Sequence, residues 1–135
     1  MKRFGIIILL WAEIVCSVSA FAQNTSQTFR FALVTDTHLK QTDPRNEAAL
    51  RQTVKDLNSQ NNLDFVIVAG DIADKGDRPS LLKAKQLLDS LKMPYYAIPG
   101  NHDTRYCKTI TTTFDSVFVQ HHFSFTHKGY FFIGF

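Results

Sequence analysis

The sequence is poor in features that would assign it to several large protein classes. It has two cysteines, Cys16 and Cys107, and the first lies in an N-terminal segment that we expect to be removed. One remaining thiol cannot form an internal disulfide, which excludes a small scaffold held by disulfides. The chain also lacks a strong charge excess, since its formal net charge is +3 and its charged residues are scattered. That balance argues against binding to nucleic acids or to anionic membranes.

Internal repeats and low-complexity segments are likewise absent from the sequence. Its composition is ordinary, with 44% hydrophobic, 20% charged and 13% aromatic residues. These fractions exclude a disordered or collagen-like chain. A length of 135 residues predicts one small domain rather than two.

The longest apolar run lies at the N-terminus. Two basic residues, Lys2 and Arg3, precede an apolar stretch that ends in the small-residue pattern Ala20-Phe21-Ala22. This order predicts a secretory signal peptide over residues 1–22, followed by a short linker over residues 23–28. We therefore expect an exported protein, periplasmic or secreted, after cleavage near Ala22.

An uncleaved membrane anchor is the alternative reading of this segment. Residues 4–22 are just long enough to span a bilayer, but Glu13 lies in the middle of the stretch. A carboxylate at that depth costs about 2.5–3.5 kcal/mol, which favours cleavage. The expected protein therefore has no membrane attachment unless the signal stays uncleaved.

Strand-like and helix-like segments alternate after the linker. Asp43 before Pro44 predicts a helix N-cap with proline at the first helical position, and Leu50, Val54 and Leu57 follow at helical spacing. Short apolar runs rich in β-favouring residues predict strands. The predicted strands are 29–35, 64–69 and 94–98, and the predicted helices begin at Pro44 and Pro79. This order is typical of an α/β layered domain with mainly parallel strands and right-handed crossovers.

The pattern changes toward the end of the chain. Residues 109–118 show no clear period and predict a loop with a short helical turn. Two apolar runs, 123–126 and 130–135, flank His127-Lys128-Gly129. These runs and the residues between them predict a β-hairpin with its turn at 127–129.

Polar clusters follow each of the three predicted strands. They are Asp36-Thr37-His38, Gly70-Asp71-Ile72-Ala73-Asp74 and Gly100-Asn101-His102-Asp103. The loops that leave the carboxyl ends of parallel strands meet at one rim of an open sheet. A lone Asp at a strand end is more often a helix cap or a turn former, but three clusters in this order are improbable by chance. We therefore expect them to converge in space.

The residue types in these clusters suit a metal site. Asp36 and His38 lie two residues apart and can turn toward one point. Imidazole combined with carboxylate selects a borderline ion such as zinc, manganese or iron. Asp71 offers a second carboxylate that could bridge two ions roughly 3.5–4 Å apart, and Asn101 offers a neutral amide oxygen as a further ligand.

Taken together, the clusters resemble the signature of the calcineurin-like metallophosphoesterases, which reads Asp-X-His, Gly-Asp-X-X-Asp and Gly-Asn-His-Asp. The resemblance covers residues 29–135, nearly the whole chain after the linker. It implies an α/β fold, a layered β-sandwich flanked by helices. This chain would hold an incomplete version of that fold, the N-terminal βαβαβ half and the start of a hairpin.

The resemblance implies a role for each residue of the site. Asp36 and His38 would bind a first metal ion. Asp71 would bridge both ions, and Asn101 would bind the second. His102 would be catalytic, stabilising the substrate phosphate or protonating the leaving oxygen. The implied cofactors are two divalent or trivalent ions, manganese, iron or zinc.

Neighbouring residues are expected to support these roles. By the same resemblance, Asp103 would act with His102 by orienting its ring, and Asp74 would brace its loop rather than touch metal. Gly70 and Gly100 lie where a chain leaving a strand must turn tightly or approach a ligand closely. All four residues are therefore expected at the rim of the sheet.

The implied activity is hydrolysis of a phosphoester bond in a small-molecule substrate by a metal-bridging hydroxide. Asp74 stands where purple acid phosphatases carry tyrosine, which argues against that branch. The runs 70–77 and 93–103 look most similar to the cyclic-nucleotide-phosphodiesterase-like branch. We therefore favour a phosphodiester substrate over a phosphomonoester.

The family's site has three further histidines, one on a later strand and two in a Gly-His-X-His block, and the chain has no such block. His121, His122 and His127 are expected as surface residues around the hairpin. We expect the N-terminal part of a longer enzyme, with weak metal binding and little activity when alone. The alternative is an inactive fragment that acts as a binding module or has no function.

The phenylalanines between Phe114 and Phe135 are expected to form an exposed apolar edge.

Overall fold

The computed structural model describes residues 28–105, 112–119 and 121–135. The predicted signal peptide over residues 1–22, nearly all of the predicted linker, and Cys107 lie outside these described residues. Within the described part of the chain, no helix combines the length and the apolar character needed to cross a membrane.

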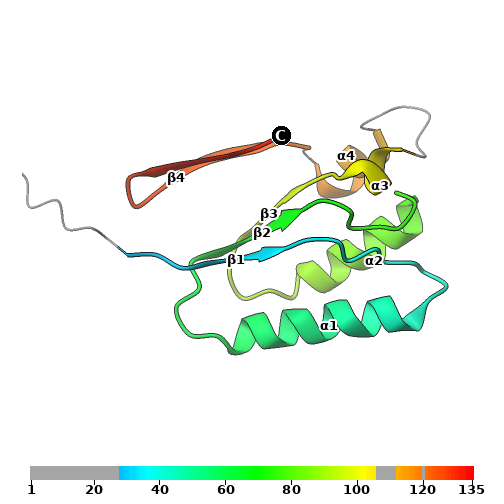
Figure 1. The fold of residues 1–135 in the computed structure, drawn as a ribbon, viewed down its shortest axis with the longest axis horizontal. Helices are drawn as coiled ribbons and strands as arrows, with labels where there is room; N and C mark the ends of the chain where they lie inside the picture. Colours follow the sequence, from blue (N-terminus) through cyan, green and yellow to red (C-terminus); the bar gives the residue numbers. More distant parts are fainter. Residues whose placement is uncertain (1–27, 106–111, 120) are drawn as a thin grey trace, which may run out of the picture.

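Three parallel strands form the central sheet (Figure 1). They are β1 (Phe31–Val34), β2 (Phe65–Ala69) and β3 (Tyr95–Ile98), hydrogen-bonded in the order β1-β2-β3. Both strand pairs are parallel. The predicted alternation of strands and helices and the parallel sheet are therefore confirmed.

The first strand is shorter than predicted, with a regular ladder over only the four residues of β1. Side chains contact the backbone on both sides of it. The Arg30 backbone N–H donates to a carboxylate oxygen of Asp64 at 3.0 Å. At the other end, the Thr35 hydroxyl oxygen lies 3.0 Å from the Ala69 carbonyl oxygen.

Two capped helices, α1 (Pro44–Ser59) and α2 (Arg78–Leu88), connect the strands. The Asp43 carboxylate accepts the Arg45 N–H at 3.0 Å, which confirms the predicted N-cap. The second helix begins one residue earlier than predicted, because Asp77 is its N-cap and accepts the Ser80 N–H at 2.9 Å. Each proline lies in the first turn, where a missing N–H costs nothing.

The two helices lie on one side of the sheet (Figure 1). Alternating residues of the strands point toward them, and an aliphatic core fills the space between. Its buried members come from α1, β2 and α2. They include Leu50, Val54, Val66, Val68, Leu81, Ala84 and Leu88. We call this side of the sheet the helix face.

An antiparallel hairpin lies on the opposite side of the sheet (Figure 1). It consists of β4 (Phe123–His127) and β5 (Tyr130–Gly134). Aromatic rings join it to the sheet: the ring of Phe125 lies 4.0 Å from that of Tyr96 and 5.1 Å from that of Phe65, measured between centroids. We call this side the hairpin face. Two layers of strands with helices outside them agree with the expected start of a β-sandwich.

The packing of the hairpin corrects two expectations. Phe123, Phe125 and Phe132 face the sheet and are not part of an exposed apolar edge. Among the described phenylalanines of residues 123–135, only Phe131 and Phe135 are mostly exposed, at 67% and 92%. The turn is also shorter than predicted. His127 pairs with Tyr130 inside the ladder, so the turn consists of Lys128 and Gly129.

Two short helices follow β3. The first, α3 (Asn101–Thr104), begins directly after the sheet, and the second, α4 (Thr112–Phe118), packs against α2. Residues 109–118 were predicted as a loop with a short helical turn, and their described part is a helix of seven residues. Packing explains its greater length, because the Phe114 and Phe118 rings stack at 4.7 Å on one side of α4 and Phe114 is buried.

Candidate metal centre

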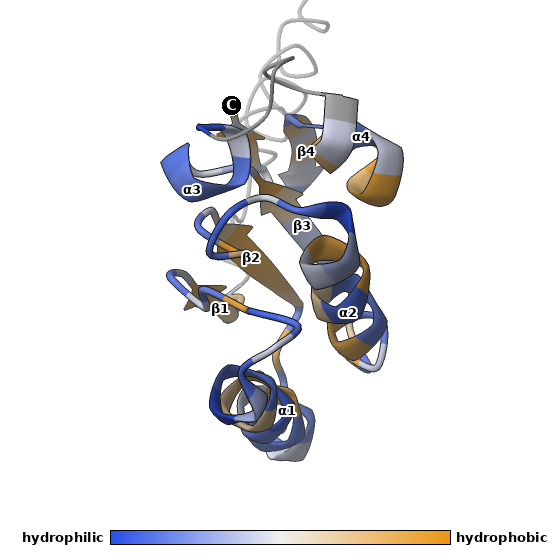
Figure 2. Cartoon of the chain, turned by 90° about the vertical axis from the view of Figure 1, so that its right-hand side faces the viewer, coloured by the Kyte–Doolittle hydropathy of each residue, from blue (hydrophilic) through white to orange (hydrophobic). Residues whose placement is uncertain are grey.

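The three polar clusters meet at the rim formed by the carboxyl ends of β1, β2 and β3. Backbone hydrogen bonds join the first two loops: the Asp36 N–H donates to the Gly70 carbonyl at 3.2 Å, and the His38 N–H donates to the Asp71 carbonyl at 2.9 Å. Figure 2 views this rim directly and shows these loops and α3 as mostly hydrophilic. The predicted convergence of the clusters is therefore confirmed.

Three residues of the rim have an uncommon backbone conformation. Asp36, His38 and Asp71 have φ values of 57°, 42° and 50°, in the left-handed region that L-residues other than glycine rarely occupy. Each such residue costs about 1–2 kcal/mol. Non-glycine residues held in this way concentrate at functional sites, where the surrounding structure offsets the strain.

Two glycines allow the second and third loops to touch. A Cβ on Gly70 would lie 2.7 Å from the Cα of Gly100, and a Cβ on Gly100 would overlap the carboxylate of Asp71. Gly70 also has φ of 77°. These glycines therefore allow the two loops to approach each other closely, and their predicted approach to a ligand stays a prediction.

Asp36, His38 and Asp71 form a compact group of potential ligands. Each offers one atom, and these atoms all lie within 4.8 Å of one another. His38 Nε2 lies 3.5 Å from Asp36 Oδ1. The Thr35 hydroxyl donates to Asp36 Oδ2 at 2.6 Å, and the His102 backbone N–H donates to Asp71 Oδ1 at 2.9 Å. Both carboxylates are therefore held in place from the protein side.

The chemistry of this group fits a divalent cation. Two carboxylates at such short range repel each other, and a cation between them would convert that repulsion into attraction. One imidazole with two carboxylates is a donor set suited to manganese, iron or zinc. The group therefore agrees with the metal site expected from Asp36, His38 and Asp71.

A second group shares His38 and adds Asp74 and His102, again with ligand atoms within 4.8 Å. The rings of His38 and His102 meet edge to face with centroids 4.6 Å apart. The Asp74 carboxylate also lies 3.2 Å from Lys40 Nζ. Asp74 was expected only to brace its loop, but it lies beside the candidate metal centre. Its place as the second aspartate of the Gly-Asp-X-X-Asp motif is the sequence feature that could have indicated this position.

The contact at the His102 ring involves Asp74 rather than Asp103. His102 Nδ1 lies 2.8 Å from the Asp74 backbone carbonyl. A carbonyl oxygen only accepts, so Nδ1 must carry the proton and Nε2 is the other, available nitrogen. The position of the imidazole is therefore set by the backbone of the second loop.

Asp103 instead holds the loops together. It is 1% exposed, and its carboxylate accepts the N–H groups of Ile72, Ala73 and Gly100 at 2.8–3.0 Å. Burial raises the pKa of this carboxyl, and the three N–H donors oppose that rise. This corrects the expectation that Asp103 orients His102, because these contacts assign it to bracing the second and third loops.

The remaining candidates lie as follows. Asn101 is the exposed first residue of α3, and its assignment as a ligand stays a prediction. His121 Nδ1 contacts the Asp115 carboxylate at 3.0 Å, and His127 Nε2 contacts the Asp64 carboxylate at 2.9 Å. Neither group of ligands formed by the described residues includes a histidine of the hairpin region.

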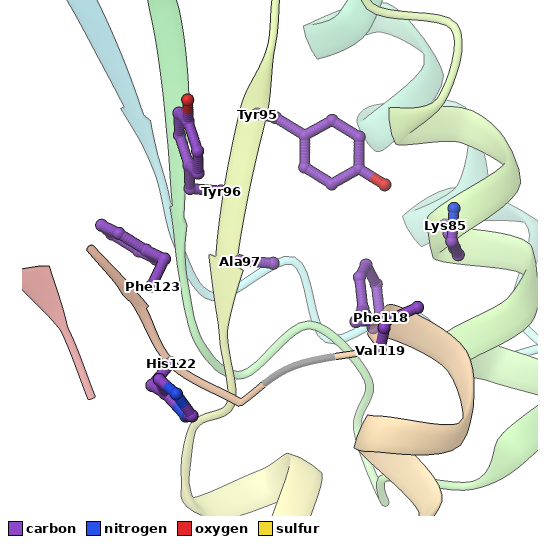
Figure 3. Close-up of a pocket in the computed structure, with 8 residues that line it drawn as sticks. All are labelled: Lys85, Tyr95, Tyr96, Ala97, Phe118, Val119, His122 and Phe123. Atoms are coloured by element: carbon purple, nitrogen blue, oxygen red, sulfur yellow. The ribbon is translucent and has the colours of Figure 1, made fainter. Parts of the chain in front are cut away.

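Two hollows adjoin the candidate metal centre. One of about 660 Å³ is lined by Asp36, His38 and Asn46 among others, and one of about 430 Å³ is lined by Lys40 and Asp74 among others. A further hollow of about 300 Å³ lies between α2, β3 and α4 (Figure 3). No predicted site residue lines this third hollow, so the first two are the candidate space for a substrate.

The rim thus combines a metal-binding donor set, a positioned imidazole and open space at the ends of a parallel sheet. The family described as calcineurin-like phosphoesterase matches residues 29–133. The chain belongs to this family.

Two curated relatives match shorter segments. The glycerophosphodiester phosphodiesterase GpdQ of Enterobacter lignolyticus is 43% identical over 44 residues, which are 33% of this chain and 16% of that protein. The probable glycerophosphodiester phosphodiesterase GpdQ of Arcobacter nitrofigilis is 45% identical over 40 residues, which are 30% of this chain and 15% of that protein. The matched segments therefore cover a small part of either relative.

Proposed function

We propose that the chain contributes to metal-dependent hydrolysis of phosphoester bonds. The observation that carries this proposal is the convergence of Asp36, His38 and Asp71 within 4.8 Å beside the imidazole of His102. Membership of the calcineurin-like phosphoesterase family supports the same reaction class. The three residues come from loops after two different strands, so only the folded chain brings them together.

Each residue has a distinct part in the proposed site. Asp36 and His38 would hold one divalent cation, Asp71 would lie between two, and Asn101 would hold the second. When bound, such cations lower the pKa of water toward neutrality and neutralise charge on the phosphoryl oxygens. The protein supplies the geometry, because left-handed backbone and hydrogen bonds set the positions of the ligands.

His102 would act on the leaving oxygen. Its Nδ1–H donates to the Asp74 carbonyl, which leaves Nε2 to hold or transfer a proton at the substrate. Interactions that stabilise charge developing in the transition state are the main source of rate enhancement in phosphoryl transfer. A fixed imidazole beside the ligand group is suited to that task.

We further propose a phosphodiester as the substrate. Support comes from the two curated relatives, which are a glycerophosphodiester phosphodiesterase and a probable glycerophosphodiester phosphodiesterase. The two hollows that adjoin the ligand group offer space for the substituents of a phosphodiester.

Metal binding and hydrolysis test the proposal together. Mn²⁺ binding by the purified chain is measured by titration calorimetry, and hydrolysis of bis-p-nitrophenyl phosphate is compared with that of p-nitrophenyl phosphate. We expect Asp71→Asn to weaken Mn²⁺ binding at least about 100-fold, because loss of even an outer-shell partner costs 10–100-fold. Asp56→Asn, on α1, is the matched control and should change nothing.

The outcomes separate the alternatives. Mn²⁺ binding that depends on Asp71, with diester hydrolysis faster than monoester hydrolysis, supports the proposal. Mn²⁺ binding without any hydrolysis supports the proposed metal centre and overturns hydrolysis by this chain alone. Absence of Mn²⁺ binding by the parent chain would overturn the proposed metal centre.

A further inference from the structure

Asn46, a residue of α1 outside all three sequence motifs, contacts the candidate metal centre. Its side-chain amide Nδ2 donates to the backbone carbonyl of His38 at 2.5 Å. It also lines the hollow that borders Asp36 and His38. The motif loop is therefore connected to the first turn of a helix as well as to the neighbouring loop.

The position of Asn46 in the helix suggests a purpose other than helix formation. Asparagine is a poor helix former, and the N-cap of α1 is already Asp43. The Asn46 amide leaves its own helix and bonds the carbonyl of a residue eight positions earlier. The side chain thus acts on His38, not on α1.

The backbone of His38 matters for the position of its side chain, because few hydrogen bonds hold the imidazole ring itself. A metal-binding histidine usually donates its second ring nitrogen to a carboxylate, carbonyl or water, which fixes the ring. Here Nε2 faces Asp36, whereas Nδ1 is buried and has no hydrogen-bond partner among the described residues. The direction of the ring therefore depends on the peptide groups on either side of His38 and on packing against His102.

Both of those peptide groups are held by hydrogen bonds. The His38 N–H donates to the Asp71 carbonyl at 2.9 Å, and the His38 carbonyl accepts from Asn46. Between them lies a left-handed backbone, with φ of 42°, that a histidine would leave if it were released. We propose that Asn46 is a positioning residue that holds His38 in the conformation required for metal binding; this inference rests on the proposed function.

Two substitutions separate positioning from general stability. Asn46→Asp keeps the shape of the side chain, removes the N–H donor and places a negative charge in the first turn of α1, where it favours the helix. The added charge would by itself strengthen cation binding, so a weaker site cannot be explained by electrostatics. Asn46→Ala removes the donor without adding charge and improves helix propensity.

Asn58 supplies a matched control near the other end of the same helix. Its side chain donates to the Ser90 carbonyl at 2.8 Å and accepts the Lys92 N–H at 2.8 Å. It lies twelve residues from Asn46, or about 18 Å along the helix. Asn58→Ala therefore removes comparable hydrogen bonds without reaching the candidate metal centre.

The probe is Co²⁺, whose visible absorption reports both affinity and ligand geometry. We expect Asn46→Asp and Asn46→Ala to raise the Co²⁺ dissociation constant about 10-fold and to change the absorption band. The thermal midpoint of the metal-free chain should not fall in either variant. Asn58→Ala should lower that midpoint and leave the Co²⁺ dissociation constant within about twofold. His38→Ala gives the spectrum of a site that lacks the ligand.

Each result decides the matter. Unchanged Co²⁺ binding in both Asn46 variants, with binding lost in His38→Ala, overturns the role of Asn46 and leaves the proposed metal centre intact. Weaker binding that follows an equal loss of metal-free stability also overturns it. If the parent chain binds no Co²⁺, the proposed function falls and the positioning role with it.

Discussion

The two faces of the central sheet are covered in different ways. Alternation along β2 sends Val66 and Val68 into an aliphatic core beneath α1 and α2, whereas Phe65 meets the aromatic rings of the hairpin. The helix face is closed, since its core residues are almost fully buried. The hairpin face is only partly closed, since Phe31 of the edge strand remains 45% exposed.

The candidate metal centre belongs to the helix face. Leu39, Ile72 and Ala73 lie within the metal-binding loops, are fully buried and are part of the aliphatic core. Asn46 reaches the same loops from α1. The hairpin contributes no residue to either ligand group formed by the described residues. The site should therefore depend on the helix face and tolerate damage to the hairpin face.

The largest effect is expected from a cavity in the helix face. Leu81 on α2 is fully buried, and Leu82 beside it is 45% exposed. Leu81→Ala should lower the free energy of unfolding by about 2–5 kcal/mol, measured by urea denaturation, because it removes packing that cannot be replaced. Leu82→Ala is the matched control and should change it by less than about 1 kcal/mol. Equal effects of the two substitutions would show that the helix face is not the closed core described above.

A smaller and more local effect is expected on the hairpin face. The half-buried ring of Phe132 lies within 6.0 Å, between centroids, of the rings of Phe31, Phe65 and Phe125. Phe132→Ala should cost about 1–3 kcal/mol, less than the 3–5 kcal/mol of a fully buried phenylalanine. Hydrogen exchange should accelerate in β4 and β5 while β2 stays protected.

The same variant also tests where the site is anchored. If the candidate metal centre depends on the helix face alone, Phe132→Ala should leave Co²⁺ binding unchanged. Loss of Co²⁺ binding in this variant, with β2 still protected from exchange, would contradict the assignment of the site to the helix face.

Sequence reasoning succeeded where the deciding interactions are local or follow from the general geometry of parallel sheets. Asp43 before Pro44 defines the start of α1 through a side-chain bond to a residue two positions later. Apolar runs and strand-end clusters define the sheet and its rim. The convergence of Asp36, His38 and Asp71 follows from the general behaviour of parallel sheets, so it could be predicted without coordinates.

Sequence reasoning failed where distant segments decide. The carboxylate of Asp103 accepts N–H groups about 30 positions earlier in the chain, which no spacing reveals, and its predicted contact with His102 is made by the Asp74 backbone instead. The phenylalanines of the hairpin were expected to form an exposed apolar edge. They pack on Phe65 and Tyr96, which only the folded sheet presents to them.

Lowering the pH should destabilise the hairpin before the central sheet, because Asp64 joins the two. Its carboxylate accepts Lys128 Nζ at 2.8 Å and contacts His127 Nε2 at 2.9 Å. The hydrogen bond from Lys128 holds the pKa of Asp64 well below its usual value, helped by the Arg30 N–H and by His127. A carboxyl with a lowered folded-state pKa stabilises the fold above its unfolded pKa of about 3.9 and loses that contribution as the pH falls further.

Hydrogen exchange between pH 6 and pH 3 tests this link. We expect the protection of β4 and β5, corrected for the intrinsic exchange rate, to decline below about pH 4 before that of β2 does. In Asp64→Asn, which has no titrating carboxyl, the decline specific to the hairpin should disappear. Asp43→Asn is the control, because asparagine still caps α1 and the hairpin should respond to acid as in the parent. Simultaneous loss of protection in all strands would mean that the two faces do not open separately.

The smallest effect on stability is expected on the outer side of the hairpin. Phe131 is 67% exposed and lies opposite Thr126 in the ladder. Phe131→Thr keeps a β-favouring residue and should change the free energy of unfolding by less than about 0.5 kcal/mol. It should nevertheless reduce self-association, measured by sedimentation velocity at rising concentration, because an exposed apolar strand at a sheet edge recruits other chains. A loss of stability as large as that of Phe132→Ala would show that the outer side of the hairpin is packed, and the contrast between a closed and a partly closed face would then be wrong.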